Sequence, residues 1–598
     1  MPVLAKRLRR KGRQGVVACQ LDNEIGMLDW VSNTPALTDH LLRDFNSWLD
    51  KTYDDGLGDR YAFAGKPAAE RDKAIRSPED GYSAALMHDL GAFMRGRFAR
   101  YVTALREAAE DNGVRGVPFL INIHGTGGGS AANFPIGISQ LMETYSGKPG
   151  MISGADFYLG DLSFRNVTDL YLVNAFMDAV HDGDQPVTAL EFDAGHADYG
   201  NTLNNQSGAE AADLKTRLCL AQGAKMINYY LFAGGFNPKL DEPAGDGNDR
   251  IGSTGERHGF AAPVDPEGRP GPSYPALKRT VHAVRGNADL LAPMKTQYDG
   301  LSLGFVPDHY LTEYHPDTDS VRAVLNDVQP VRGFGPGGAL ARAMLLSGFR
   351  YDSVNLQAGG LDPARTPVLA LATGEYLDGA IQRRLVRYVE AGGKLLLSGL
   401  LPGKDLAGRP ATELRDALGL KPGKTLNDAN RFFLSVTAHG WAAPRAEIRV
   451  GKAQLCTASR GDVVLREVST GRAAASTSAW ARAGRWSSPT TTALTSTSGP
   501  RPCASWARCR GSPTTRGCPG CSSSPRRTRT AGGCCTPSTS PPVTPRTSPS
   551  RSAASRCSAA NGCICRGAAR RCCRWASQRA GCASRTPRRR SAPWRRGG

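Results

Sequence analysis

The chain has 598 residues and a formal net charge of +20 at pH 7, but residues 468–598 hold 24 Arg and no Asp, Glu or Lys, so residues 1–467 are mildly acidic. This distribution removes the reason to expect a nucleic-acid partner, and no apolar run approaches the roughly 18 residues that span a membrane. Only three of the 15 cysteines precede residue 468, too few for a disulfide framework, which predicts a reduced, cytoplasmic protein: Cys19, Cys219 and Cys456.

The first strand follows a short basic segment. Residues 1–15 lack the apolar stretch of a signal peptide. Residues 16–21 form an apolar run, typical of a strand buried on both faces of a parallel sheet. The run leads into Asn23 and Glu24, and the carboxyl end of such a strand is where a (β/α)8 barrel keeps its catalytic groups. So short a leading segment cannot contain earlier barrel strands, so we expect the chain to begin inside a barrel.

Strands and helices then alternate. Apolar residues at helical spacing predict four helices, over 35–53, 83–112, 168–181 and 208–221. Apolar runs predict four more strands, over 117–124, 156–159, 187–192 and 226–232. This alternation predicts a parallel sheet. The predicted fold class is therefore α/β, with a partial (β/α)8 TIM barrel that holds strands 4–8.

A second α/β unit is predicted downstream. A helix over 274–291 and a strand-rich connector over 298–330 lead to a βαβ pattern, typical of a doubly wound sheet and read as structural. Its helices are predicted over 339–348 and 378–391, and its strands over 367–371 and 394–398. The predicted domains are the partial catalytic barrel (1–297), the doubly wound domain (298–425), the start of a small β-domain (426–466) and a low-complexity tail (467–598).

The tail is rich in Arg, Ser, Pro and Cys and has too little apolar surface to offset its ordering entropy. Its composition is that of a GC-rich gene translated out of frame, so we expect a frameshift near residue 467. The alternative is a disordered basic arm that binds nucleic acid. Four cysteines imitate a zinc pattern without periodic flanking structure, so no metal and no cofactor is predicted: Cys518, Cys521, Cys534 and Cys535.

Two glutamates carry the predicted chemistry. Glu191 ends the strand 187–192 as Glu24 ends the first, and glycoside hydrolysis needs one acid to protonate the leaving oxygen and a second carboxylate to attack or activate water. Each glutamate, taken alone, is equally compatible with a solvated loop position. Candidate sugar-binding residues are amides and aromatic side chains near strand ends: Asn23, Trp30, Asn122, Tyr158, Tyr230 and Phe232. For the four aromatic side chains, core or rim packing is the alternative.

These segments resemble a known group of enzymes. Gln20-Leu21-Asp22-Asn23-Glu24 resembles the strand-4 Asn-Glu motif of clan A retaining glycosidases, specifically the β-galactosidases of glycoside hydrolase families 35 and 42. Residues 189–192 resemble their strand-7 nucleophile segment, and residues 228–235 resemble their strand 8. The resemblance implies that Glu24 is the general acid/base, that Glu191 is the nucleophile and that Asn23 binds the hydroxyl next to the anomeric carbon.

The resemblance implies a retaining exo-glycosidase that removes terminal β-D-galactosyl residues from an oligosaccharide or polysaccharide by double displacement. The alternative is a non-catalytic carbohydrate-binding protein, a decayed barrel. Residues 339–400 resemble the amidotransferase-like domain of family 42, which implies a trimer in the intact parent. Because an open five-stranded remnant exposes strand edges, we expect the chain by itself to be poorly stable and inactive.

Overall fold

The structure is a computed structural model. The residues that it describes are 16–25, 36–123, 135–163, 166–181, 183, 185–195, 208–238, 241, 256–259, 262–312, 315–333, 335–427, 434–440, 443, 448–459, 461–476 and 492–493. The chain divides into two units, and every described residue lies in the first, Met1–Thr514. Within the described residues, no helix combines the length and apolarity needed to cross a bilayer.

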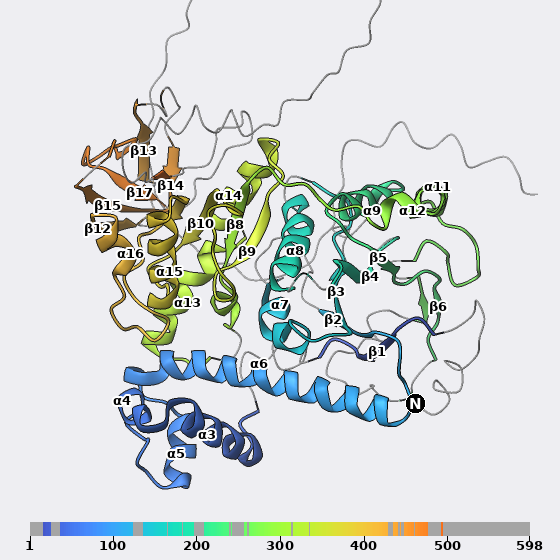
Figure 1. Cartoon of the computed structure of the whole chain (residues 1–598), viewed down its shortest axis with the longest axis horizontal. Helices are drawn as coiled ribbons and strands as arrows, with labels where there is room; N and C mark the ends of the chain where they lie inside the picture. The colour runs from blue at the N-terminus through green and yellow to red at the C-terminus, as the bar shows by residue number, and fades with distance from the viewer. Residues whose placement is uncertain are drawn as a thin grey trace, which may run out of the picture. The chain divides into compact units, whose positions relative to one another are not determined.

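Five parallel strands form the first sheet, in the order in which they occur along the chain (Figure 1). Each overlaps one predicted strand. The side chains of β2, β3 and β4 are largely buried, whereas those of β5 are exposed or half-buried. In β2 all five side chains are buried, as expected of a strand covered on both faces. The strands are β1 (Cys19–Asp22), β2 (Phe119–Ile123), β3 (Met151–Phe157), β4 (Thr188–Phe192) and β5 (Met226–Tyr229).

The first helix of the part of the chain that holds this sheet is α3, which starts at Asp39. The Thr38 hydroxyl caps it by accepting a 3.3 Å hydrogen bond from the Leu41 backbone N–H. The four predicted helices correspond to α3, α6, α8 and α9, whereas the helical turns over residues 57–76 were not predicted. The bounds are α3 (Asp39–Tyr53), η1 (Asp54–Gly56), α4 (Leu57–Arg60), α5 (Ala68–Arg76), α6 (Asp80–Asp111), α7 (Pro135–Leu141), η3 (Met142–Thr144), α8 (Val167–Val180), α9 (Ala211–Ala221), β6 (Gly235–Phe236), β7 (Arg257–His258), α11 (Tyr274–Gly286) and α12 (Ala288–Leu291).

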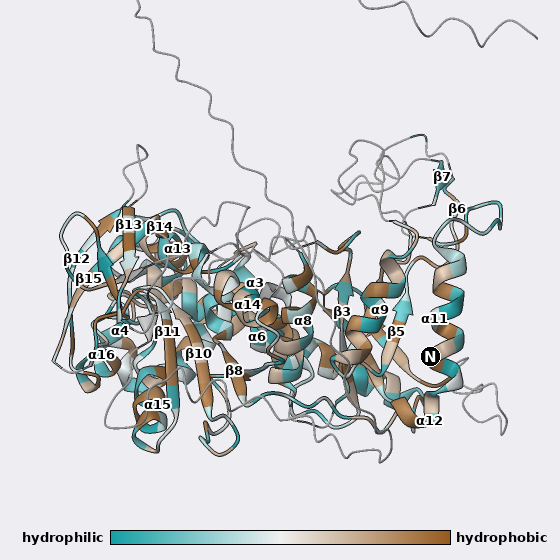
Figure 2. Cartoon of the chain, turned by 90° about the horizontal axis from the view of Figure 1, so that it is seen from above, coloured by the Kyte–Doolittle hydropathy of each residue, from teal (hydrophilic) through white to brown (hydrophobic). Residues whose placement is uncertain are grey.

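The second sheet has the order β18-β11-β10-β8-β9, with β8 to β11 parallel and β18 antiparallel to β11. Because β9 and β10 lie on opposite sides of β8, the sheet is doubly wound. The connector predicted to be strand-rich is instead mainly helical, because β8 is followed by η4 and α13. Figure 2 colours β8, β10 and β11 largely as hydrophobic. The bounds are β8 (Leu301–Phe305), η4 (Pro307–Tyr310), α13 (Asp319–Val331), α14 (Pro336–Leu346), β9 (Asp352–Asn355), β10 (Val368–Thr373), α15 (Gly379–Glu390), β11 (Lys394–Gly399), α16 (Glu413–Ala417) and β18 (Thr492–Ala493).

Short antiparallel strands follow, in two three-stranded sheets ordered β12-β15-β17 and β14-β13-β16. β12 crosses the domain boundary expected at residue 425, and β17 lies beyond the boundary expected at residue 466. The antiparallel β-structure therefore extends beyond the predicted range 426–466 at both ends. Its strands are β12 (Leu420–Asn427), β13 (Leu434–Ala438), β14 (Ile448–Val450), β15 (Lys452–Ala458), β16 (Leu465–Glu467) and β17 (Ala474–Ser476).

The two α/β sheets share one hydrophobic core. Phe176 of α8 stacks on Phe305 of β8, with ring centroids 4.2 Å apart and planes 14° from parallel. Beside this pair, the Tyr171 hydroxyl donates a 2.7 Å hydrogen bond to the Tyr351 backbone carbonyl. Burial of large aromatic side chains at the junction stabilises the contact between α8 and the second sheet.

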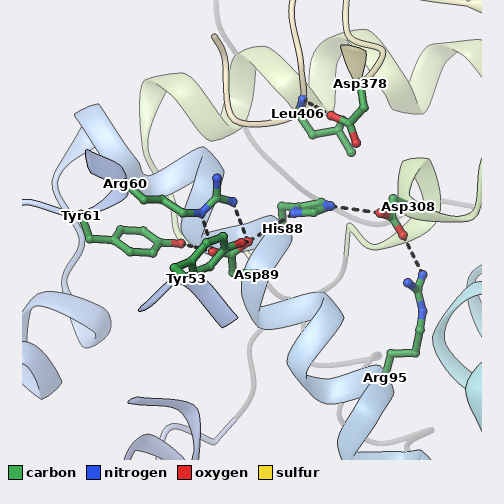
Figure 3. A network of polar contacts seen from close by, with 9 residues as sticks. All are labelled: Tyr53, Arg60, Tyr61, His88, Asp89, Arg95, Asp308, Asp378 and Leu406. Carbon is green, nitrogen blue, oxygen red and sulfur yellow. Dashed lines mark hydrogen bonds and ion pairs between the residues drawn. The ribbon is translucent and has the colours of Figure 1, made fainter. Parts of the chain in front are cut away.

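A largely buried chain of ion pairs also joins α6 to the second sheet (Figure 3). Asp308, in η4, accepts hydrogen bonds from His88 at 3.0 Å and from Arg95 at 2.9 Å. The second ring nitrogen of His88 lies 3.3 Å from Asp89, which also accepts a 2.7 Å hydrogen bond from Arg60. Burial alone lowers the pKa of His88, but its hydrogen bonds to Asp308 and Asp89 outweigh burial and raise this pKa to about 10. His88 is therefore a cation at neutral pH, held between two aspartates.

Candidate active site

Four polar side chains lie at the carboxyl ends of adjacent strands. Glu24 follows β1, Asn122 is in β2, Asp156 is in β3 and Glu191 is in β4. Because the strands are parallel, these ends meet at one edge of the sheet, where (β/α)8 enzymes place their reacting groups. The register sets Asp156 directly beside Glu191, next to an irregularity that shifts the pairing of β3 and β4 by one residue. Such a bulge re-aims the side chains next to it.

The three carboxyl groups are close together. One carboxylate oxygen of each lies within 4.8 Å of one from each of the others, for Glu24, Asp156 and Glu191. The structure therefore brings together the two glutamates predicted to form the acid pair. It adds Asp156, which was treated only as part of a strand. The predicted strand, 156–159, begins at Asp156, so the rule that selects a charged residue ending an apolar strand did not select it. The observed β3, Met151–Phe157, places Asp156 near the carboxyl end instead.

Asn122 connects these groups. Its side chain is 1% exposed. The Asn122 amide nitrogen donates to Asp156 at 3.2 Å and to Glu191 at 3.4 Å, and its oxygen accepts a 2.8 Å hydrogen bond from the Glu24 backbone N–H. Asn122 was predicted to bind substrate. Both of its amide hydrogens point to protein carboxyl groups, and its contacts position both glutamates.

The backbone of Glu24 is in a left-handed conformation, with φ 47°. For a residue other than glycine this region is sparsely populated, and such strain is kept only where surrounding contacts hold it, as at many functional sites. Here the hydrogen bond from the Glu24 N–H to Asn122 is one such contact.

Tyr158 holds the other glutamate. Its hydroxyl donates a short hydrogen bond to Glu191 Oε2. Burial raises the pKa of Tyr158 well above its usual value, and the hydrogen bond to Glu191 and the charge of that group raise the pKa further. The phenol therefore stays protonated and remains a donor to Glu191. Tyr158 was predicted as a sugar-stacking platform, and the structure places its hydroxyl as a donor to Glu191.

Asp156 is the most buried of the three acids, at 2% exposure. Burial raises the pKa of its carboxyl group well above the usual range, and the neighbouring charges of Glu191 and Glu24 raise it further. Like charges this close cannot all ionise at little cost. Burial and these neighbouring charges therefore favour the protonated form of Asp156.

The remaining predicted residues are farther out. The Asn23 side chain is exposed and accepts a 3.2 Å hydrogen bond from Gln20. Tyr230 and Phe232 are 37% and 51% exposed beyond β5, as sugar-stacking surfaces would be. Trp30 lies outside the described residues.

A buried ion pair supports the end of β4. Asp193, two residues after Glu191, pairs with Lys215 of α9, and the two side chains are 0% and 1% exposed. Asp193 also accepts a 3.3 Å hydrogen bond from the Gly160 backbone N–H. Together, the two contacts of Asp193 connect the segment that follows β3 and the segment that follows β4 to α9. Neither Asp193 nor Lys215 was predicted from the sequence.

Among the described residues, two groups have the donor atoms of a metal site within 4.8 Å of one another. The first is the acid cluster itself, Glu24, Asp156 and Glu191. The second is His88, Asp308 and Asp378. In this second group both ring nitrogens of His88 already contact aspartates and Arg95 pairs with Asp308. Its charges are thus paired within the protein, and it is a structural ion network.

Comparison with known proteins gives the context of this geometry. A family model described as "GLMA-like, second domain" matches residues 322–448. A β-1,2-glucosyltransferase of Ignavibacterium album is 25% identical over 424 residues, covering 68% of this chain and 56% of that protein. An exo-β-D-glucosaminidase of Pyrococcus horikoshii is 26% identical over 253 residues, covering 40% of this chain and 30% of that protein. The chain thus spans about half or less of the length of these relatives.

Solved structures of β-galactosidases are similar in fold. The enzyme of psychrophilic Marinomonas ef1 superposes with a TM-score of 0.55 at 15% identity, covering 79% of this chain and 68% of that one. The enzyme of Rahnella sp. R3 superposes with a TM-score of 0.57 at 13% identity, covering 78% of this chain and 64% of that one. The E323A mutant of a GH42 β-galactosidase of G. stearothermophilus superposes with a TM-score of 0.54 at 13% identity, covering 72% of this chain and 59% of that one. The fold is glycoside-hydrolase-like. At these identities the likeness concerns the fold, and specificity does not follow from it.

Proposed function

We propose that this chain carries the acid pair of a retaining β-glycoside-active enzyme, with Glu191 as the nucleophile and Glu24 as the general acid/base. The observation that carries the proposal is that a carboxylate oxygen of Glu24 and one of Glu191 lie within 4.8 Å of each other at one sheet edge. Inverting enzymes need about 6.5–9.5 Å between their carboxyl groups to admit a water, whereas retaining enzymes need about 5–5.5 Å. The shorter spacing supports double displacement through a glycosyl-enzyme intermediate.

The contacts of each glutamate support its role. Glu191 receives hydrogen bonds from Tyr158 and Asn122, and such bonds favour the ionised form that a nucleophile needs. A carboxylate oxygen of Glu24 lies within 4.8 Å of one from Glu191, so Glu24 is placed to pass a proton to the leaving oxygen of a sugar held between them. The exposed rings of Tyr230 and Phe232 are placed to stack on the apolar face of a sugar.

For the sugar, the relatives that are similar in sequence favour gluco-configured groups, because their names specify β-1,2-glucosyl transfer and β-D-glucosaminide cleavage. The resemblance of the Asn-Glu segment, together with fold likeness to β-galactosidases, supports terminal β-D-galactosyl groups as the second candidate. Since the nucleophile and acid are the same in both, only the groups that bind the sugar hydroxyls separate the candidates. Water or a second sugar is the acceptor for the glycosyl-enzyme.

The test is turnover and trapping. The chain would be incubated with 4-nitrophenyl β-D-glucoside, β-D-glucosaminide and β-D-galactoside, and the anomer formed first would be identified by NMR. A retained β-anomer, and a 2-fluoro-glycosyl adduct on the peptide containing Glu191, are the expected results. An α-anomer, or an adduct elsewhere, would refute the assignment.

A further inference from the structure

Asp156 has no place in the two-glutamate mechanism, yet it is built into the site. It is 2% exposed, lies opposite Glu191 in the sheet register, and has an oxygen within 4.8 Å of both glutamates. Burying a carboxyl group costs free energy unless a specific contact offsets it. The described contact of Asp156 Oδ2 is the amide nitrogen of Asn122 at 3.2 Å, and Oδ1 is buried with no hydrogen-bond partner among the described residues.

We propose that Asp156 is a positioning residue for Glu191, which acts through the Asn122 amide that the two carboxyl groups share. This inference rests on the proposed function and adds a third carboxyl group to its site. The Asn122 nitrogen has two hydrogens, and Asp156 and Glu191 each accept one. With Asp156 accepting one hydrogen, the amide plane is fixed, and the second hydrogen points at Glu191 Oε1.

A neutral Asp156 suits this role. The titratable groups that face it are Glu191 from β4 and Glu24 from the end of β1, with Tyr158 on its own strand as a further donor to Glu191. A negative charge on Asp156 would compete with Glu191 for the Asn122 hydrogens and would favour protonation of the nucleophile. A protonated Asp156 fills the same space and accepts the same hydrogen bond without adding charge.

The burial of Asp156 and Asn122 favours a positioning role over direct contact with substrate. Neither Asp156 nor Asn122 is exposed by more than 2%. Asp156 therefore acts on the reaction through Glu191, and its loss is expected to lower kcat while KM changes little.

Two variants test the role. Asp156→Ala removes the acceptor and frees the Asn122 amide, and displacement of a reacting group by even a fraction of an ångström gives an expected fall in kcat of about tenfold or more. Asp156→Asn is neutral, has the same shape and can still accept the Asn122 hydrogen, so it is expected to recover kcat to within about threefold of wild type. The matched control is Asp327→Ala. Asp327 is a buried carboxyl group of α13 whose pKa burial also raises, and it lies outside the acid cluster.

Equal kcat losses for Asp156→Ala and Asp327→Ala would overturn the proposal, as would an Asp156→Asn variant no better than Asp156→Ala.

A second readout needs no turnover. Because the folded protein holds a proton on Asp156 at pH values where the unfolded chain has lost it, wild-type stability is expected to fall relative to Asp156→Asn as pH rises from about 4. Replacing Glu191 by Gln should weaken this dependence, because it removes the charge that favours the proton. Thermal unfolding at several pH values would measure both effects. A difference between wild type and Asp156→Asn that is independent of pH, or unaffected by Glu191→Gln, would refute the coupling even if the chain proved inactive on every glycoside.

Discussion

Glu24 and Glu191 come from the first and fourth strands of one parallel sheet, and a carboxylate oxygen of each lies within 4.8 Å of one from the other. These two residues are far apart in the chain, and β2 and β3 lie between their strands in the sheet. Asn122 on β2 spans the gap, since it contacts the Glu24 backbone and the Glu191 side chain. The acid pair is thus held by the sheet itself, and each member can be tested separately.

Glu24→Gln should impair catalysis in a way that depends on the leaving group. A general acid contributes about 10²–10⁴-fold when the leaving oxygen needs a proton. A dinitrophenyl glycoside has a good leaving group and needs no proton, so its cleavage should lose much less than that of an alkyl glycoside. Steady-state rates on both substrates, with Glu191→Gln as the comparison, would measure this. Loss of equal size on both substrates would contradict an acid role for Glu24.

Asn122→Ala should lower both stability and kcat. It leaves Asp156 and the Glu24 N–H without their described partner, and an unsatisfied buried polar group costs about 1–3 kcal/mol. Asn174→Ala is the matched control, because Asn174 is a buried amide on α8 that donates a 3.1 Å hydrogen bond to Gln222. Urea unfolding should show similar losses for the two variants, whereas only Asn122→Ala should lose kcat. A normal kcat for Asn122→Ala would show that the amide does not position the glutamates.

Lys215→Met should destabilise the chain by about 3–5 kcal/mol, because it leaves Asp193 as a buried charge without its partner. Changing both members to apolar residues should recover part of this loss. The comparison is Arg217→Ala, which breaks an exposed pair with Asp213 on the same helix and should cost less than about 1 kcal/mol. Free energies from urea unfolding would separate the two cases. Equal costs for Lys215→Met and Arg217→Ala would contradict the buried-pair account.

His88 should make stability depend on pH in the alkaline range. Its pKa is raised to about 10 in the folded chain, above its ordinary value of about 6.5. A raised pKa means that the stabilisation is fully present below the unfolded value and is lost as pH rises through the folded value. Wild type should therefore lose stability between about pH 6.5 and 10 relative to His88→Gln. Parallel curves of unfolding free energy against pH for the two proteins would rule this out.

The sequence predicts the strands of both sheets well where an apolar run is buried on both faces, as in β2 and β10. It fails where the local pattern is mixed. Residues 319–331 form α13, although the connector containing them was predicted to be strand-rich, because the apolar side of that helix packs against Ala84 and Met87 of α6. β9, with only four residues, was missed for lack of a long apolar run.

By itself the sequence determined which glutamates end apolar strands, because strand period and charge placement are local properties. Only the tertiary structure decided that Asp156 joins them, that Asn122 turns inward to bind protein groups and that Lys215 reaches Asp193. These facts depend on which strands become neighbours and on their register. A shift of one residue in that register turns a side chain to the opposite face of the sheet, so no single segment contains the information.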